Sequence, residues 1–413
     1  MSKQPDARIL PPPYDRVGKH DMRADVSHDD TARFNFLANL NVHLSQGLFP
    51  GNRLAYEKRV QPRFNRDQGR DFANRQEIRK EMRKDAHYQT WAAMRRNSME
   101  MRHQVGLSVV LGQINKLNAK ANSYNEGKNT LSLNSELEVP GYLAAVDNHC
   151  MPGSYYSELM EGDVSTAANY DIGTFVTGAG SMSCQGDGGG RALAKFIKSK
   201  FVEFSPKRIL DLGCGIGSNV LPIASAFPDA EILAVDIGAP FLRYGHARAQ
   251  AMGVSNVHFV QMDGESLDFE AKSFDWIQTT MFWHETSVIA LRKIMREIFR
   301  LLVPGGLTLH LEQPNFEDST PLYEQFIRDW DAWYNNEPFW SKLHTMDVLD
   351  EMEQAGFNRP SFIEERLSPD VEKGVYPPWA STMSRHVAEQ NDSRARNKQV
   401  TGGGGWYMFG AWK

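Results

Sequence analysis

The sequence lacks several features that mark secreted, membrane-spanning and cysteine-rich proteins. Its three cysteines, Cys150, Cys184 and Cys214, show no CxxC spacing, so neither a disulfide framework nor a cysteine zinc site is expected. The longest apolar stretch, residues 105–114, is interrupted by glycine and falls far short of the roughly 20 residues that span a bilayer. The first residues, MSKQPDARILPPPYDR, have no apolar signal segment. These absences predict a protein of the reducing cytoplasm without a membrane span.

No charge of one sign dominates the chain. It has 51 acidic and 46 basic residues and a net charge of -5, so no overall positive field indicates a nucleic-acid partner. Basic residues concentrate at 53–102, with 14 Lys and Arg against 7 Asp and Glu. The interleaved acids favour ion pairing along solvated helices over a nucleic-acid surface. The 12 histidines show no HxxxH or HExxH pattern, so no metal is predicted.

The apolar pattern in the first third of the chain predicts helices. Apolar residues recur at three- and four-residue steps from Phe34 to Leu44, which is typical of an amphipathic helix. Gly47 and Pro50 are expected to end this helix, and Asn74 has the spacing of a helix cap for a second one. Two further segments follow: an apolar-rich stretch at 94–117 and a connection rich in Asn, Ser and Gly at 118–141.

The second half of the chain alternates short strands with helices. This alternation predicts an α/β fold, with a doubly wound parallel sheet covered by helices on both faces. The expected strands are residues 208–212, 231–235, 256–261, 274–279, 306–312, 361–366 and 406–412.

A glycine-rich loop, DLGCGIG at 211–217, directly follows the first of these strands and precedes a helix. Asp236 ends the second strand about 20 residues later, where a carboxylate can accept hydrogen bonds from ribose hydroxyls. Asp263 ends the third strand at the same edge of the sheet. The GxGxG spacing differs from the dinucleotide pattern GxGxxG, and no Lys-Ser/Thr pair completes a Walker motif. The pattern predicts a ligand bound at the carboxyl edge of the sheet.

Five segments appear together in order: DLGCGIG, AVDIG, VQMDGES, FDWIQTTMFWHE and LLVPGGLTLHLEQP. In this arrangement the chain resembles the class I S-adenosylmethionine-dependent methyltransferases, particularly the branch that acts on small molecules. The resemblance covers about residues 195–413. It implies a Rossmann-like sheet of seven strands with an antiparallel last strand, S-adenosylmethionine as cofactor and S-adenosylhomocysteine as product.

The resemblance also implies which residues contact this cofactor. Gly213, Gly215 and Gly217 would pass under its methionine part. Asp211 would meet its ammonium, and Asp236 would bind its two ribose hydroxyls. The other implied contacts are Cys214 in the loop, Ile237 beside the adenine, Met262, Asp263 and Gly264 around the adenine amino group, and Thr279 and Thr280 near the sulfonium.

Two residues are predicted to act in the chemistry. The sulfonium methyl is already activated, so the enzyme mainly aligns the acceptor and excludes water. His284 lies just past the fourth strand, where an imidazole could accept the acceptor's proton. The alternative is that His284 caps a helix or packs beside Trp283. Glu312 ends the fifth strand and would bind a cationic or hydroxylated substrate, or make a structural hydrogen bond.

Aromatic residues supply the predicted substrate contacts. Trp330 and Trp340 belong to an aromatic-rich insertion at 314–345, which could form a wall for a flat, apolar or cationic substrate. A packed helix face is the alternative. Tyr155 and Tyr156, together with His149, could fold over the cofactor from outside the catalytic domain, although packing alone would also explain them. Trp283 completes the predicted substrate contacts.

The complete sequence interpretation is a methyltransferase acting on a small molecule, with the acceptor and its O, N, C or S atom left open. Nucleic acid and membranes are not expected as partners, and a homodimer through the N-terminal helices is possible. The alternatives are an enzyme acting on RNA or protein and a non-methylating protein that binds S-adenosylmethionine.

The predicted parts of the chain are a flexible arm at 1–28, a helical cap or oligomerisation region at 29–150, a connecting segment at 151–190 that closes on the active site, and the methyltransferase domain at 191–413 with its aromatic lid at 314–345. The polar stretch 368–400 has no assigned role.

Overall fold

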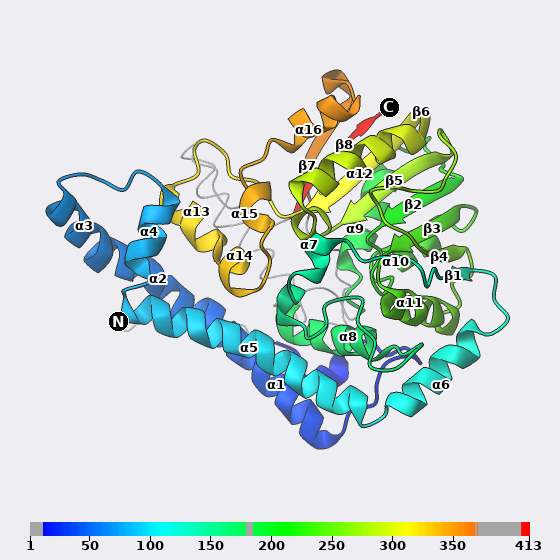
Figure 1. Cartoon of the computed structure of the whole chain (residues 1–413), viewed down its shortest axis with the longest axis horizontal. Helices are drawn as coiled ribbons and strands as arrows, with labels where there is room; N and C mark the ends of the chain where they lie inside the picture. Colours follow the sequence, from blue (N-terminus) through cyan, green and yellow to red (C-terminus); the bar gives the residue numbers. More distant parts are fainter. Residues whose placement is uncertain (1–10, 179–184, 368–369, 371–405) are drawn as a thin grey trace, which may run out of the picture.

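The computed structural model describes residues 11–178, 185–367, 370 and 406–413. It combines an α/β body with long N-terminal helices that run beneath this body and project beyond it (Figure 1). One mixed sheet has the strand order β1-β4-β3-β2-β5-β6-β8-β7. Its strands are β1 Leu131–Ser132, β2 Arg208–Leu212, β3 Glu231–Asp236, β4 Val257–Gln261, β5 Phe274–Thr280, β6 Leu302–Glu312, β7 Phe362–Leu367 and β8 Trp406–Trp412.

The predicted Rossmann-like fold class is confirmed. Strands β4, β3, β2, β5 and β6 are parallel, and β8 lies antiparallel between β6 and β7. The sheet has one strand more than the seven expected, because Leu131 and Ser132 pair in parallel with β4. This strand lies within 118–141, which was expected to be only a connection. Two residues in a polar segment are too few to show strand alternation.

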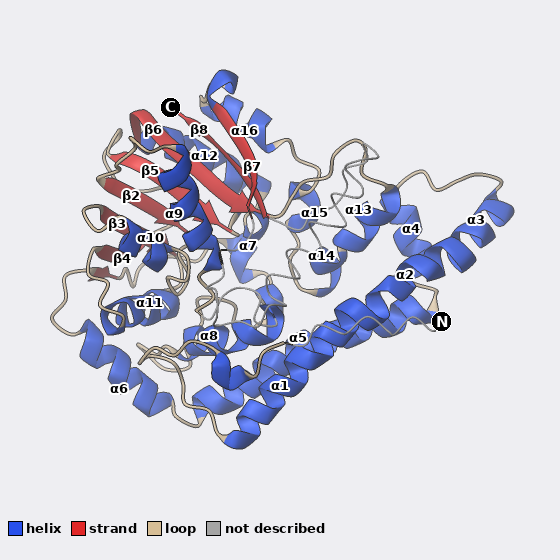
Figure 2. Cartoon of the chain, turned by 180° about the vertical axis from the view of Figure 1, so that it is seen from behind, coloured by secondary structure: helices blue, strands red, loops and turns tan. Residues whose placement is uncertain are grey.

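Helices cover both faces of the sheet (Figure 2). The central strands are apolar on both sides, as expected for parallel strands between two helical layers. Leu210 and Ile277, on β2 and β5, belong to the same core as α12 Val288–Leu301 and α16 Val348–Ala355. Ile209 and Trp276 belong to the opposite core. That core also receives helices α9 Gly188–Lys200, α10 Val220–Ala226 and α11 Ala239–Ala251.

The helical path from His28 to Gln68 does not end at Gly47 and Pro50, contrary to the prediction. Its segments are α1 His28–His43, a π-helical turn Leu44–Leu48, α2 Phe49–Ala55, a second π-helical turn Tyr56–Val60 and α3 Gln61–Gln68. A proline in a helix collides with the carbonyl four residues before it. A wider π turn precedes both Pro50 and Pro62, and we attribute the continuation of the helix to this local widening.

The remaining N-terminal helices agree better with the sequence. Asn74 caps α4 Arg75–Met82 as predicted, and its side chain accepts a hydrogen bond from the backbone N–H of Glu77 at 3.0 Å. The apolar-rich stretch divides between α5 Ala86–Leu111 and α6 Ile114–Asn125, so helix extends into the expected connection. No helix among the described residues is long and apolar enough to cross a membrane.

The described part of the predicted flexible arm is packed. Tyr14 is buried and stacks on Phe34 with 4.6 Å between ring centroids, and Phe175 meets it edge-on. Met22 is fully buried, and its carbonyl accepts a hydrogen bond from the Tyr244 hydroxyl at 3.1 Å. A few well-placed apolar residues therefore anchor a segment whose prolines suggested an arm. Residues 1–10 and most of 368–400 lie outside the described residues.

The N-terminal helices and the α/β body share one hydrophobic core. Phe34 and Val110 from the helices pack in the same cluster as Phe241 and Tyr244 of α11. Between them lies α8 Ser165–Gly178, inside the segment predicted to be a connection. Helix α9 begins at Gly188, within that segment and before the predicted domain start at 191. The predicted parts are thus joined by a continuous interior.

A buried ionic network ties this junction together, and removing its carboxylate should destabilise the fold. Tyr244 donates a hydrogen bond to Asp171 at 2.8 Å, while His20 and Arg23 lie 3.2 and 3.7 Å from that carboxylate. Burial raises the pKa of Asp171, but Arg23, His20 and Arg248 together outweigh burial, lower the pKa and keep the carboxylate charged. Asp171→Asn leaves Arg23 unpaired and should lower the free energy of unfolding by about 2 to 3 kcal/mol, measured by chemical denaturation. The exposed Asp29→Asn is the control, and equal stability of both variants would contradict the prediction.

Buried neutral histidines should make the fold sensitive to acid. His246 contacts the Thr130 hydroxyl at 2.8 Å and the Asn125 side-chain oxygen at 2.7 Å. Burial lowers the pKa of His246 to about 4, so the unfolded chain takes up this proton first as the pH falls below 6.5. Between pH 7.5 and 5, wild-type protein should lose about 2 kcal/mol of stability relative to His246→Gln. Denaturation curves whose difference does not change with pH would contradict this prediction.

Candidate functional site

The glycine-rich loop turns at the carboxyl end of β2. The backbone N–H groups of Gly213 and Cys214 donate to the carbonyl of Val235 at 2.8 and 3.1 Å. Gly213 has a φ of 72°, and a Cβ there would lie 2.3 Å from the ring of Phe282. Any side chain would therefore be strained and would collide with Phe282. Cys214 is buried and packs in the core behind the loop.

Two carboxylates lie beside this loop. Asp236 ends β3 and accepts hydrogen bonds from the backbone of Gly215 and Gly238, both at 2.9 Å. Asp211 is 2% exposed and accepts a hydrogen bond from the amide of Gln278. Burial raises the pKa of Asp211, and the nearby Asp236 raises it further. The pair is suited to a ligand that brings hydroxyl donors and a positive charge, as S-adenosylmethionine does.

The other predicted cofactor contacts lie along the same edge of the sheet. Met262 donates its N–H to the carbonyl of Asp236 at 3.2 Å. Asp263 accepts from the backbone of Glu265 at 2.9 Å, and burial raises its pKa. The backbone carbonyl of Ile237 accepts a hydrogen bond from the side-chain amide of Gln261. Gly264 has open space around it, because a Cβ there would lie 3.6 Å or more from the nearest side chains, Ile294 and Phe282.

The two threonines at the end of β5 are less accessible than the sequence suggested. Thr279 is fully buried, and its hydroxyl lies 2.9 Å from Nδ1 of His310. The Thr280 hydroxyl donates to the side-chain oxygen of Gln278 at 3.1 Å. These hydroxyls already have partners, so any contact of Thr279 with the sulfonium would involve its backbone.

His284 and Glu312 form a buried pair just beyond β5. The two residues are 3% and 1% exposed, and Nδ1 of His284 lies 2.7 Å from Oε1 of Glu312. The backbone N–H of Trp283 donates to Oε2 of the same carboxylate at 2.9 Å. Glu312 thereby fixes the imidazole orientation and leaves Nε2 facing away from it. Burial lowers the pKa of His284, but Glu312 and two further glutamates outweigh burial and raise it to about 9.

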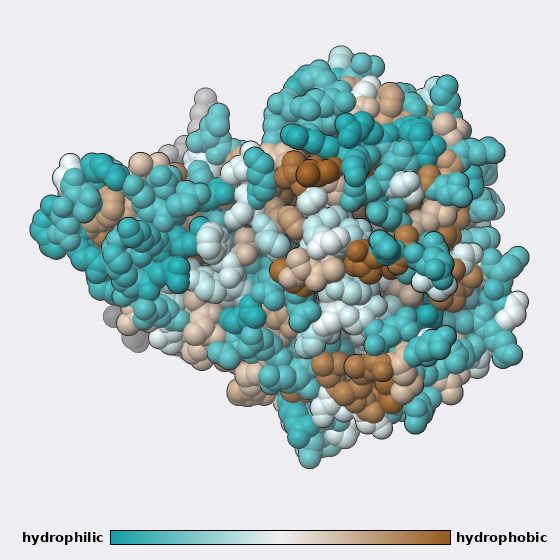
Figure 3. Space-filling model, in the orientation of Figure 1, coloured by the Kyte–Doolittle hydropathy of each residue, from teal (hydrophilic) through white to brown (hydrophobic). Residues whose placement is uncertain are grey.

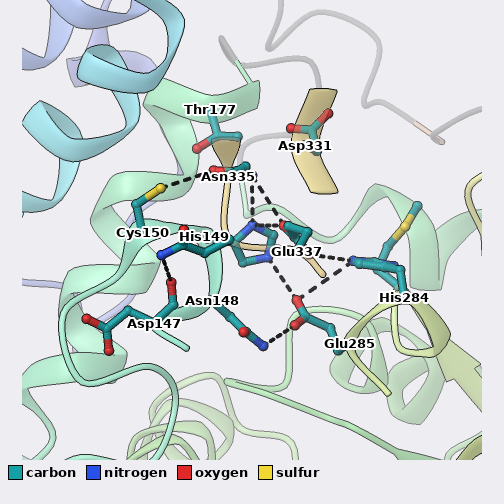
Figure 4. A network of polar contacts seen from close by, with 12 residues as sticks. Asp147, Asn148, His149, Cys150, Thr177, His284, Glu285, Asp331, Asn335 and Glu337 are labelled. Carbon is teal, nitrogen blue, oxygen red and sulfur yellow. Dashed lines mark hydrogen bonds and ion pairs between the residues drawn. The ribbon is translucent and has the colours of Figure 1, made fainter. Parts of the chain in front are cut away.

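The further glutamates belong to a cluster drawn from distant parts of the chain (Figure 4). Glu285 follows His284 in a short helical turn, Glu337 comes from the aromatic insertion, and His149 comes from the segment before the α/β body. Nε2 of His149 lies 3.0 Å from Oε1 of Glu285, and its Nδ1 lies 2.5 Å from Oε1 of Glu337. Nε2 of His284 is 3.8 Å from both glutamates.

Tyr155 joins this cluster to the cofactor edge of the sheet. Its hydroxyl donates to Glu285 at 2.8 Å. Its backbone carbonyl approaches Gly238, two residues after Asp236, so closely that a Cβ there would lie only 2.5 Å from the oxygen. The Tyr155 ring also packs edge-on against Phe241 at 5.3 Å. The structure thus brings Tyr155 between the two parts of the candidate site, and Tyr156 is half-buried beside it.

The predicted aromatic substrate contacts separate into two groups. Trp340 stacks on the His284 imidazole with 4.5 Å between ring centroids, so it lies at the cluster. Trp330 is buried instead against Trp91 of α5 at 5.8 Å, and Trp283 is buried edge-on to His310. For Trp330 and Trp283 the packed interior is the correct interpretation, because neighbouring helices and strands cover their rings.

Sequence reasoning singled out neither Glu337 nor Glu285 as a functional residue. More than 180 residues separate His149 from Glu337 in the sequence, so no local spacing could have revealed their contact. The only usable signal was the proposal that His149 and Tyr155 reach the site from outside the catalytic domain.

Part of this site lies in a segment that is similar to known methyltransferases. Residues 209–306 match a family model described as a methyltransferase domain. A demethylmenaquinone methyltransferase of Thermus thermophilus is 34% identical over 113 residues, which cover 27% of this chain and 50% of that protein. A ubiquinone/menaquinone biosynthesis C-methyltransferase, UbiE, of Yersinia pestis is 27% identical over 201 residues, which cover 48% of this chain and 70% of that protein.

These similarities leave much of the chain outside the aligned regions. The match spans about half the length of the first curated relatives. Among solved structures, a Haemonchus contortus phosphoethanolamine N-methyltransferase 2 with S-adenosyl-L-methionine is 18% identical, covers 54% of this chain and 52% of that chain, and has a TM-score of 0.37. His149, Glu312 and Glu337 all lie outside the residues that match the family model.

Proposed function

We propose that this chain, which carries a class I S-adenosylmethionine-dependent methyltransferase domain, transfers the methyl group of that cofactor to a small-molecule acceptor. The observation that carries the proposal is the continuity between the cofactor edge and the buried cluster. Tyr155 contacts the loop after Asp236 with its carbonyl and the cluster residue Glu285 with its hydroxyl. The names of the matched relatives, a demethylmenaquinone methyltransferase and a ubiquinone/menaquinone biosynthesis C-methyltransferase, support a small-molecule acceptor.

The cofactor would lie along the carboxyl edge of the sheet. Gly213, Gly215 and Gly217 would pass under its methionine part, Asp211 would meet its ammonium, and Asp236 would accept hydrogen bonds from its ribose hydroxyls. The adenine would lie among Ile237, Met262, Asp263 and Gly264. The residues after β5, where His284 begins the cluster, would face the sulfonium.

Methyl transfer would occur between this sulfonium and an acceptor bound at the cluster. The acceptor's electron pair forms the new bond to the methyl carbon while the C–S bond breaks, and S-adenosylhomocysteine is the product. A hydroxyl or acidic carbon must also lose a proton. We assign this proton to Nε2 of the neutral form of His284, which Glu312 aligns through Nδ1. Because the pKa of His284 is raised to about 9, this neutral form prevails only in alkaline solution. Trp340, stacked on His284, would contact the acceptor.

The basic segment 53–102 supports a small acceptor over nucleic acid. Many of its cations already have partners: Arg59 pairs with Asp85 at 2.8 Å, Arg70 pairs with Glu77 at 2.7 Å, and Arg79 pairs with the buried Asp329. The projecting end around α3 and α4 has a largely hydrophilic surface (Figure 3). These contacts fit solvated helices that also anchor the insertion 314–345, which would close the site. A homodimer through these helices stays a prediction.

A labelled-methyl transfer assay tests the proposed function. The full chain is incubated with methyl-labelled S-adenosylmethionine and a metabolite extract, and the products are separated by mass spectrometry. We expect a labelled small molecule and an equal amount of S-adenosylhomocysteine, both absent with Asp236→Ala. Label on RNA or protein alone would overturn the acceptor class. Cofactor binding without any labelled product would favour a non-methylating protein.

A further inference from the structure

The cluster around His284 has the composition of a metal site, although the sequence predicted none. We infer that His149, His284, Glu285 and Glu337 together bind one divalent transition-metal ion. Each residue offers one ligand atom, and these atoms all lie within 4.8 Å of one another. Two imidazoles with two carboxylates suit ions such as Zn²⁺, Mn²⁺ or Fe²⁺ better than Mg²⁺ or Ca²⁺, which prefer oxygen ligands alone.

The two imidazoles are oriented in the same way. Nδ1 of His284 lies 2.7 Å from Oε1 of Glu312, and Nδ1 of His149 lies 2.5 Å from Oε1 of Glu337. Each ring therefore directs Nε2 toward Glu285, at 3.8 and 3.0 Å respectively. Donors bound to one ion at roughly 2.1 Å lie about 3 to 4 Å apart, so these separations need little adjustment. A carboxylate on the far nitrogen is the usual support for a metal-binding histidine.

Glu337 provides an independent observation that points to a ligand. Its side chain has no exposed surface, and Oε2 has no hydrogen-bond partner among the described residues. Oε2 faces Nε2 of His284 at 3.8 Å, while Oε1 is occupied by His149 and by the amide of Asn335 at 3.2 Å. A buried carboxylate oxygen without a donor is costly. A cation between Oε2 and Nε2 would satisfy both atoms.

Charge and backbone geometry agree with this assignment. Three carboxylates, Glu285, Glu312 and Glu337, surround two imidazoles in a buried volume, so neutral imidazoles would leave an excess of negative charge. The backbone is also unusual, because His149 and Cys150 adopt φ values of 55° and 58°. Such left-handed residues persist where the surroundings over-determine them, and they concentrate at ligand sites.

The ion deepens the proposed function, on which its chemical role rests. It would occupy Nε2 of His284, so the acceptor's proton would be removed through the ion and not by the free imidazole. A hydroxyl acceptor would bind the ion, its O–H bond would break and the proton would pass to water. The oxygen pair would then attack the methyl carbon as the C–S bond breaks. A bound cation would thus make the hydroxyl more acidic at neutral pH.

Metal titration of the full chain tests the inference. Chelator-treated protein is titrated with Zn²⁺ by calorimetry and with Co²⁺ by visible absorption, which reports nitrogen and oxygen ligands. We expect one site per chain. Glu337→Gln and His149→Gln should weaken it at least about 100-fold, and Glu312→Gln about 10- to 100-fold. The control is His28→Gln, whose side chain is 95% exposed.

The outcomes separate this inference from the proposed function. Absence of stoichiometric binding, or wild-type affinity in Glu337→Gln with intact thermal unfolding, would overturn the metal site. Full methyl transfer by chelated, metal-free protein would overturn the ion's role in the reaction while leaving the proposed function intact. Specific Zn²⁺ binding that Glu337→Gln abolishes would support the metal site even if no extract yields a methylated product. S-adenosylhomocysteine binding, measured on the same samples, confirms that each variant is folded.

Discussion

Asp236→Ala is expected to weaken S-adenosylhomocysteine binding by roughly 100-fold or more. The proposed binding mode has two ribose hydroxyls donating to this carboxylate, and a hydrogen bond to a charged group contributes about 1.5 to 3 kcal/mol. Asp236 also accepts from the backbone of Gly215 and Gly238. Its removal therefore loosens the loop on which the ligand would lie. Isothermal calorimetry measures the effect.

The control for Asp236→Ala is Asp268→Ala, which changes an aspartate in the loop after β4 that is not assigned to the cofactor. We expect this variant to keep wild-type affinity, and thermal unfolding of both variants to show that the fold is retained. Equal affinity of Asp236→Ala and the wild type would refute the cofactor placement, and the methyl-transfer proposal with it.

His284→Ala is expected to lower turnover by roughly 100- to 10,000-fold, the range for loss of a group that handles a proton. The same variant should bind S-adenosylhomocysteine nearly as tightly as the wild type, because His284 lies beyond the predicted cofactor contacts. The expected signature is a fall in kcat with little change in cofactor affinity, measured by single-turnover methyl transfer and calorimetry. The prediction holds whether Nε2 accepts the proton itself or binds an ion.

His258→Gln on β4 is the matched control, since it changes a half-buried histidine of the same sheet away from the cluster. Glu312→Gln should show a smaller loss than His284→Ala, because an amide can still accept from the backbone of Trp283 but no longer carries the charge that aligns His284. Wild-type turnover in His284→Ala would leave the residue with a packing role only.

The sequence predicted the sheet and the positions of the glycine-rich loop, Asp211 and Asp236 at its carboxyl edge, because these features are local. Continuous apolar runs mark parallel strands, and the loop with Asp211 and Asp236 lies where each strand ends. Hydrogen bonding from Gly215 and Gly238 to Asp236 then follows from two segments about 20 residues apart. The errors arose where local signals conflicted with packing. Pro50 suggested a helix end, and Trp330 suggested a substrate wall although it is buried against Trp91.

The cluster could not be predicted in the same way. His284 and Glu312 were singled out as strand-end residues, but their contact depends on the sheet placing β5 and β6 side by side. His149 and Glu337 reach the same point only because the N-terminal helices pack against the α/β body in one hydrophobic cluster and against the insertion in another. The glutamates gathered there also raise the pKa of His284 to about 9, because their charges outweigh the opposing effect of burial.

The sequence by itself determined the Rossmann-like fold and the cofactor loop, since both depend on residues close together along the chain. Only the tertiary structure decided which side chains share the acceptor end of the site. Four polar residues from three distant segments meet there because hydrophobic burial fixes the segments that carry them. The spacing of these four residues along the chain does not indicate that they lie close together.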